Sequence, residues 1–202
     1  MILASNFIIA VVGVTKKLDL ILDEIRKSCF EMYDYINSNF GNKSRSYTGK
    51  STLTTELFKH YNLLMYPQPG FHDLYSEIQR FFYETHGGQY KRYYIQSWLN
   101  FYKKGDYIDW HSHWSKEKNS WHGFFCVDCG DGTSGTLYRI IDVKNELFVP
   151  SENNLLVMSK SEKDIHKSTE WNDEINPRIT IAFDIVPAEH IDDDLPNHWI
   201  PI

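Results

Sequence analysis

The periodicity of the apolar residues changes near position 91, and this change constrains the fold more than any other feature of the chain. Before it, apolar residues recur at spacings of three and four, as in helices; after it, they alternate or form short runs, as in strands. The strand-like segments are YYIQSWLNFY (93–102), YIDWHSHW (107–114), WHGFFCV (121–127), GTLYRIID (135–142), NLLVMS (154–159) and RITIAFDIV (178–186). Helices followed by about six to eight strands predict an α+β or mainly β fold, with the helices on one face of an antiparallel barrel or sandwich.

Two amphipathic helices are predicted in the first part of the chain. One lies within residues 15–41, with Gly41 just past its end, and the other within residues 71–88, with Gly87 and Gly88 as its stop. The inward positions are Leu18, Leu22, Ile25, Cys29, Met32 and Ile36 in the first helix, and Leu74, Ile78 and Phe81 in the second. The apolar segment 1–14 is too short to cross a bilayer and predicts a buried strand.

The whole chain, residues 1–202, is predicted to be a single domain, because it has no internal repeat, low-complexity tract or linker. Its parts are a helical N-terminal part (1–90), a barrel core (91–188) and a C-terminal tail (189–202). The net charge of −6 argues against general nucleic-acid binding. Three cysteines are too few for a disulfide framework, so we expect a reducing, cytoplasmic setting. We also expect no membrane partner, because the apolar segment is too short to cross a bilayer.

Two histidines two residues apart, His111 and His113, stand out in the predicted strand 107–114. Residues two apart on a strand point the same way, so these imidazoles are expected to share a face with Tyr107 and Asp109. Such a pair can offer two ligands to one metal ion. An isolated pair of this kind is nevertheless better explained by ordinary hydrogen bonding.

Three residues further along the chain change this balance. His166 follows the predicted strand 154–159, and Arg178 and Thr180 share a face at the start of the strand 178–186. Fe(II) that must also bind O2 and a chelating co-substrate needs open coordination positions, which three protein ligands provide. A far carboxylate of the co-substrate would need a bidentate cation, and Arg provides this better than Lys.

With these residues in order, the segment from about Gln96 to Val186 resembles the 2-oxoglutarate and Fe(II)-dependent oxygenase superfamily. It is most similar to small members common in marine bacteria and cyanophages. The motif residues are Trp98, Asn100, Tyr102, Gly105, Asp106, Tyr107, His111 and His113, followed by WHGFFCV, His166 and RITIAF. The resemblance implies a double-stranded β-helix (a cupin-like jelly roll) with N-terminal helices packed on it.

The resemblance also implies a role for each site residue. His111 and His166 would be iron ligands, and Arg178, assisted by the Thr180 hydroxyl, would bind the far carboxylate of 2-oxoglutarate. Tyr102 and Asn100 lie on a strand that often makes a polar contact to this co-substrate. The implied activity is a dioxygenase that uses Fe(II), 2-oxoglutarate and O2 to hydroxylate an unidentified substrate, with release of succinate and CO2. The enzyme would act in the cytoplasm, or in the host cytoplasm if it is phage-encoded.

The first histidine pair departs from the superfamily pattern, which usually has H-x-D or H-x-E. Either His113 replaces the carboxylate, giving a three-histidine site, or Asp109 completes the site. Asp109 lies on the wrong side of His111, so His113 is favoured as the third metal ligand. A neutral ligand in this place leaves the metal site one charge unit more positive.

Three further residues have candidate roles. Cys126 and Cys129 form a lone C-x-x-C that Gly-Asp-Gly follows, so no helix begins there to stabilise a thiolate, and structural cysteines are predicted. His122 can line the pocket or be a core histidine whose hydrogen bonds are satisfied.

Two other functions stay open: a three-histidine cupin-type dioxygenase that does not use 2-oxoglutarate, and a non-catalytic jelly-roll binding module.

Overall fold

The computed structural model describes most of the chain. The described residues are 2–4, 7–13, 16–40, 48–49, 52–55, 62–86, 91–114, 119–130, 133–140, 146–191 and 198–202. The predicted helix stops Gly41, Gly87 and Gly88 lie outside these residues.

Two antiparallel sheets form the body of the protein. The large sheet has, in order, β1 (Ile2–Ala4), β2 (Phe7–Gly13), β9 (Leu155–Lys160), β6 (Trp121–Asp128), β11 (Arg178–Pro187), β4 (Tyr93–Tyr102) and β12 (Ile200–Pro201), with β3 (Leu53–Thr54) also paired to β4. The small sheet has the order β5 (Ile108–His111), β10 (Asp164–Ser168), β7 (Gly135–Ile140) and β8 (Glu146–Pro150). Together they form a double-stranded β-helix.

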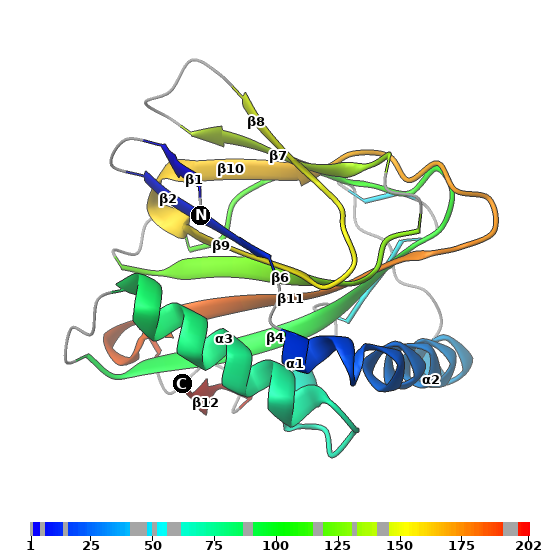
Figure 1. The fold of residues 1–202 in the computed structure, drawn as a ribbon, viewed down its shortest axis with the longest axis horizontal. Coiled ribbons are helices and arrows are strands. Elements are labelled where there is room, and N and C mark those ends of the chain that lie inside the picture. Colours follow the sequence, from blue (N-terminus) through cyan, green and yellow to red (C-terminus); the bar gives the residue numbers. More distant parts are fainter. Residues whose placement is uncertain are drawn as a thin grey trace.

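The helices pack on the outer face of the large sheet, on the side away from the small sheet (Figure 1). They are α1 (Lys16–Asp19), α2 (Leu22–Phe40) and α3 (Phe71–His86), and short 3-10 turns lie at Leu63–Met65, Ser161–Lys163 and Ala188–His190. The single helix predicted within residues 15–41 is therefore two helices, separated by a turn at Leu20 and Ile21. The predicted inward positions are confirmed, with Leu22 only partly buried.

Strand β11 shows how one sequence serves two buried surfaces. Its side chains alternate, as strand geometry requires. The apolar residues at 179, 181, 183 and 185 join the core under the helices. Arg178, Thr180 and Asp184 are also buried but belong to the opposite face, toward the small sheet. The large sheet is therefore covered on both sides, and the polar side chains lie between the two sheets.

Several strands differ from the prediction. The predicted strand 1–14 is the two strands β1 and β2, so the N-terminal part is not wholly helical. The predicted strand 107–114 is only β5, which ends at His111. Strands β8 and β10 were not predicted, because short, partly exposed strands carry little periodicity. Within the described residues, no helix is long and apolar enough to cross a membrane.

A candidate metal centre and anion site

A cavity of about 270 Å³ lies between the two sheets. Every site residue predicted from the sequence lines it: His111, His113, His166, Arg178, Thr180, Tyr102 and Asn100. The histidines come from the small sheet and its continuation, and the other four residues come from β4 and β11 in the large sheet. The fold thus brings the whole predicted set to one place.

A bulge in β5 turns His111 into this cavity. His111 pairs with His166 on β10, and the next pair is Ile108 with Ser168. Between these two pairs β5 advances by three residues and β10 by two, so β5 contains one extra residue, which is a β-bulge. Ile108 and His111, three residues apart, therefore both line the cavity. The expectation that Tyr107 and Asp109 share the face of His111 is wrong, because the bulge breaks the alternation and both of these side chains are exposed.

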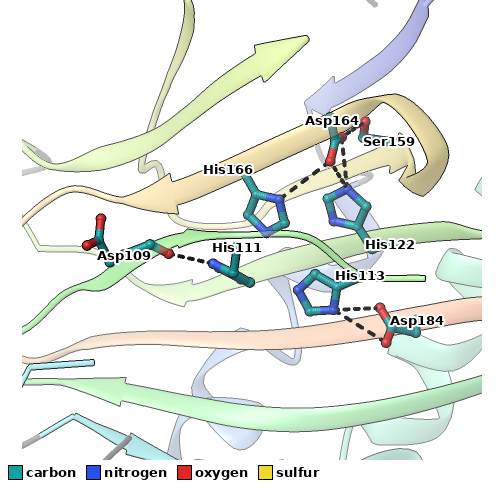
Figure 2. Close-up of polar contacts among 8 residues, drawn as sticks. All are labelled: Asp109, His111, His113, His122, Ser159, Asp164, His166 and Asp184. Carbon is teal, nitrogen blue, oxygen red and sulfur yellow. Dashed lines mark hydrogen bonds and ion pairs between the residues drawn. The ribbon is translucent and has the colours of Figure 1, made fainter. Parts of the chain in front are cut away.

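His113 lies past the end of β5, yet its ring lies close to the rings of the other two histidines. The ligand atoms that His111, His113 and His166 offer all lie within 4.8 Å of one another. Figure 2 shows the three rings converging, with the Asp109 carboxyl pointing away from them. The Trp98 ring stacks on the His113 ring at a centroid distance of 5.6 Å. Asp109 is therefore not a member of this cluster, whereas His113 is.

Each of these three rings has an oxygen atom close to Nδ1. The Nδ1 of His111 hydrogen-bonds the carbonyl oxygen of Asp109 at 2.7 Å, and that of His113 lies 3.1 Å from the Asp184 carboxylate. The Nδ1 of His166 lies 3.6 Å from the Asp164 carboxylate. For His111 and His113, these oxygen acceptors hold the proton on Nδ1 and make Nε2 the ligand atom, as is usual for metal-binding histidines. The distance of 3.6 Å at His166 is too long for a hydrogen bond.

Burial keeps two of these histidines neutral. Burial, together with the neighbouring His166 and His113, lowers the pKa of His111 to about 2. Burial, together with His122, lowers the pKa of His166 to about 3, although Asp164 acts in the opposite direction. Neutral imidazole is the form that binds metals. Both rings are therefore in the metal-binding form at neutral pH.

Behind His166 lies a second polar cluster that crosses between the sheets. His122 on β6 hydrogen-bonds both carboxylate oxygens of Asp164 on β10, each at 2.9 Å, and the hydroxyl of Ser159 donates to the same carboxylate. Burial alone would raise the pKa of Asp164, but His122 and His166 lower it well below its usual range. His122 thus combines both predicted roles, since it lines the cavity and is hydrogen-bonded in the core. Asp164 was not among the site residues predicted from the sequence.

The other part of the cavity contains a buried cation. Arg178 is 2% exposed, and its described hydrogen bond is a long one of 3.3 Å from Nη2 to the hydroxyl of Thr136. Among the described residues, its Nε and Nη1 atoms have no hydrogen-bond partner. The Tyr102 ring lies 5.1 Å from the guanidinium. A buried, unpaired guanidinium is costly, so this arrangement fits an anion that enters the cavity.

Strand pairing places Tyr102 and Asn100 beside this cation. In the register of β4 and β11, Tyr102 is opposite Arg178, and Asn100 is opposite Thr180. Burial raises the pKa of Tyr102, so its hydroxyl is neutral and able to donate a hydrogen bond. Around the guanidinium the strands thus collect the donors that a carboxylate requires.

The cysteine pair lies in the packing between the sheets. Cys126 lies near the end of β6, and Cys129 follows just after it. Both are buried free thiols in the apolar cluster around Trp98. Within the described part of the chain, neither cysteine joins a group of potential metal ligands. This placement agrees with the structural role predicted for them.

Solved structures with this fold include enzymes of the 2-oxoglutarate and Fe(II)-dependent oxygenase type. A prolyl hydroxylase from Trichoplax adhaerens, in complex with a hypoxia inducible factor peptide fragment, has a TM-score of 0.66 at 9% identity, over 90% of this chain and 84% of that one. A prolyl-4-hydroxylase from Pseudomonas putida has a TM-score of 0.64 at 12% identity, over 90% and 93% of the two chains. The non-heme alpha ketoglutarate dependent carbocyclase SnoK from nogalamycin biosynthesis has a TM-score of 0.60 at 11% identity, over 87% and 78%.

At these identities the likeness shows a shared fold. No protein-family model matches the sequence, and no curated protein matches it. The predicted double-stranded β-helix with N-terminal helices is therefore confirmed, while the chemistry has to be argued from the site.

Proposed function

We propose that this protein is a 2-oxoglutarate- and Fe(II)-dependent dioxygenase that hydroxylates its substrate with release of succinate and CO2. One observation carries the proposal. A cluster of three histidines, whose ligand atoms lie within 4.8 Å of one another, shares a cavity with a buried guanidinium that lacks an anion among the described residues. A metal ligand set and a carboxylate-binding cation in one cavity are what a chelating keto acid requires.

Each of the predicted site residues has a role in this proposal. His111, His113 and His166 would hold Fe(II) through Nε2, and Arg178 would bind the far carboxylate of 2-oxoglutarate. When bound, the metal and 2-oxoglutarate supply the oxidation of a substrate C–H bond by O2. Thr180 and Tyr102 would donate hydrogen bonds to the acid beside Arg178 and help to orient it. Arg178, Thr180 and Tyr102 are buried, which strengthens these charge interactions.

The two other candidate functions account for fewer of these features. A cupin-type dioxygenase that does not use 2-oxoglutarate has no need of a buried Arg178 in the same cavity as the three histidines. A binding module with structural histidines does not account for three imidazoles whose ligand atoms lie within 4.8 Å of one another in the same cavity as a buried guanidinium. The substrate stays unidentified, and the likeness to small marine bacterial and cyanophage members stays a prediction from the sequence.

An anaerobic Fe(II) titration with and without 2-oxoglutarate tests the proposal. Chelation of Fe(II) by the keto acid produces a visible charge-transfer band, and we expect this band at one equivalent of each. Stoichiometric Fe(II) binding without a band would favour the cupin-type enzyme. No stoichiometric metal binding would favour the binding module.

A further inference from the structure

Asp184 lies at the centre of β11, where its carboxylate meets the third histidine of the cluster. It is 7% exposed. The Nδ1 of His113 lies 3.1 Å from Oδ1 and 3.4 Å from Oδ2, and the indole N–H of Trp114 donates to Oδ2 at 3.0 Å. Figure 2 shows this carboxylate behind His113, on the side away from the other two rings. Asp184 therefore contacts the one site residue that departs from the superfamily pattern.

His113 depends on side-chain contacts for its position more than the other two histidines do. His111 and His166 lie on paired strands, whereas His113 lies in a bend beyond the end of β5. The next residue, Trp114, has φ of 47°, a left-handed conformation that is strained for a bulky side chain. The bonds from Asp184 to both residues hold this bend against the large sheet.

The charge of Asp184 also calls for a partner. A buried carboxylate is stable only when hydrogen bonds and a positive charge compensate it. In the part of the chain that the structure describes, no Lys or Arg forms an ion pair with Asp184. Its described donors are the imidazole of His113 and the indole of Trp114. A divalent cation on the far side of the His113 ring would provide the missing positive charge.

We propose that Asp184 is a positioning residue for His113. It also supplies the negative charge that the H-x-H pair lacks, because His113 stands where a carboxylate is usual. It holds the proton of His113 on Nδ1, directs Nε2 toward the metal and places one negative charge behind the neutral ligand. This inference rests on the proposed metal site. It makes the three-histidine cluster together with Asp184 equal in charge to two histidines and a carboxylate.

The test compares Mn(II) binding to the full-length wild type, Asp184→Asn and Asp34→Asn by calorimetry, with Mn(II) as a redox-inert probe. Asp34→Asn is the control, because it removes the same charge from an exposed side chain on α2 that does not line the cavity. We expect the Kd for Mn(II) to rise about 10- to 100-fold in Asp184→Asn and to stay unchanged in the control. Equal affinities for wild type and Asp184→Asn would overturn the role of Asp184 alone, and so would an equal loss in both variants. A wild type that binds no Mn(II) would overturn the proposed metal site itself.

Nitrogen-15 NMR of the metal-free wild type provides a second measurement that needs no variant to fold. In the neutral form of the ring, we expect His113 to carry its proton on Nδ1. A wild-type His113 protonated on Nε2 would contradict the proposal, whatever the metal affinities are.

Discussion

Arg178 shows at the scale of one residue how the cavity prepares a site for an acid. Its guanidinium is buried between β11 and β7, and Thr136 is its one described hydrogen-bond acceptor. Folding has removed this charge from water, and two of its nitrogen atoms have no hydrogen-bond partner among the described residues. An incoming anion therefore meets a cation that is already desolvated and oriented.

Replacement of Arg178 by Ala is expected to weaken 2-oxoglutarate binding about 10- to 150-fold, because a hydrogen-bonded charge contributes about 1.5–3 kcal/mol. Arg178→Lys should lie between the wild type and Ala, since it keeps the charge but loses the planar fork. The charge-transfer band during an anaerobic titration measures this affinity. Arg139→Ala is the control, because Arg139 is an exposed arginine on the outer face of β7 paired with Glu146. Unchanged affinity in Arg178→Ala would remove Arg178 from the site.

At the scale of elements, the bulge in β5 decides which residues enter the cavity. The hydroxyl of Ser168 on β10 accepts the backbone N–H of Ile108 at 2.6 Å, where the regular ladder between the two strands is interrupted. A side chain thus replaces the hydrogen bond that the bulge displaces. The bulge and His111 are held by the same strand that carries His166.

Ser168→Ala is expected to lower the free energy of unfolding by about 1–3 kcal/mol, because it leaves a buried N–H without its acceptor. We also expect weaker Mn(II) binding, since the bulge orients His111. Urea unfolding and calorimetry measure the two effects. In Ser76→Ala, which removes an exposed hydroxyl from α3, both quantities should stay at the wild-type value.

Helix α3 contributes its apolar face to the core under the large sheet. Leu74 is completely buried there, whereas Leu20, in the turn between α1 and α2, is 86% exposed. Leu74→Ala should lower the free energy of unfolding by about 2–5 kcal/mol through lost burial and a cavity. Leu20→Ala deletes the same atoms and should change it by less than about 0.5 kcal/mol. Similar losses in urea unfolding would mean that α3 does not pack as described.

At the scale of the whole molecule, polar side chains join the two sheets across the cavity. His113 reaches Asp184 on β11, His122 on β6 reaches Asp164 on β10, and Arg178 reaches Thr136 on β7. A metal bound to the three histidines would therefore be connected to both sheets. Metal binding and the stability of the barrel should be linked.

Mn(II) at about 100 times its Kd is expected to stabilise the folded protein by about 2.7 kcal/mol, because the unfolded chain lacks the preformed site. Thermal or urea unfolding with added Mn(II), and then with a chelator, measures this gain and its reversal. His166→Ala should abolish the gain, and His72→Ala, on the exposed face of α3, should keep it. A gain that persists in His166→Ala would place the metal elsewhere.

The sequence by itself determined most of the long elements and a set of candidate site residues. The periodicity predicted helical structure within 15–41 and 71–88 and the strands β4, β6 and β11, because burial on one or two faces imposes a regular spacing of apolar residues. His111, His113, His166 and Arg178 were found from their order, and the structure brings them to one cavity. Residue types suited to one chemistry can be recognised before their positions are known.

Only the tertiary structure decided which faces these residues use and what lies behind them. The alternation rule assumes an unbroken strand, so the bulge that exposes Asp109 and turns His111 inward could not be predicted. Asp184 and His113 are 71 residues apart in sequence and meet because two sheets pack face to face. No local pattern encodes such a contact, since its partners are set by the packing of strands distant in the chain.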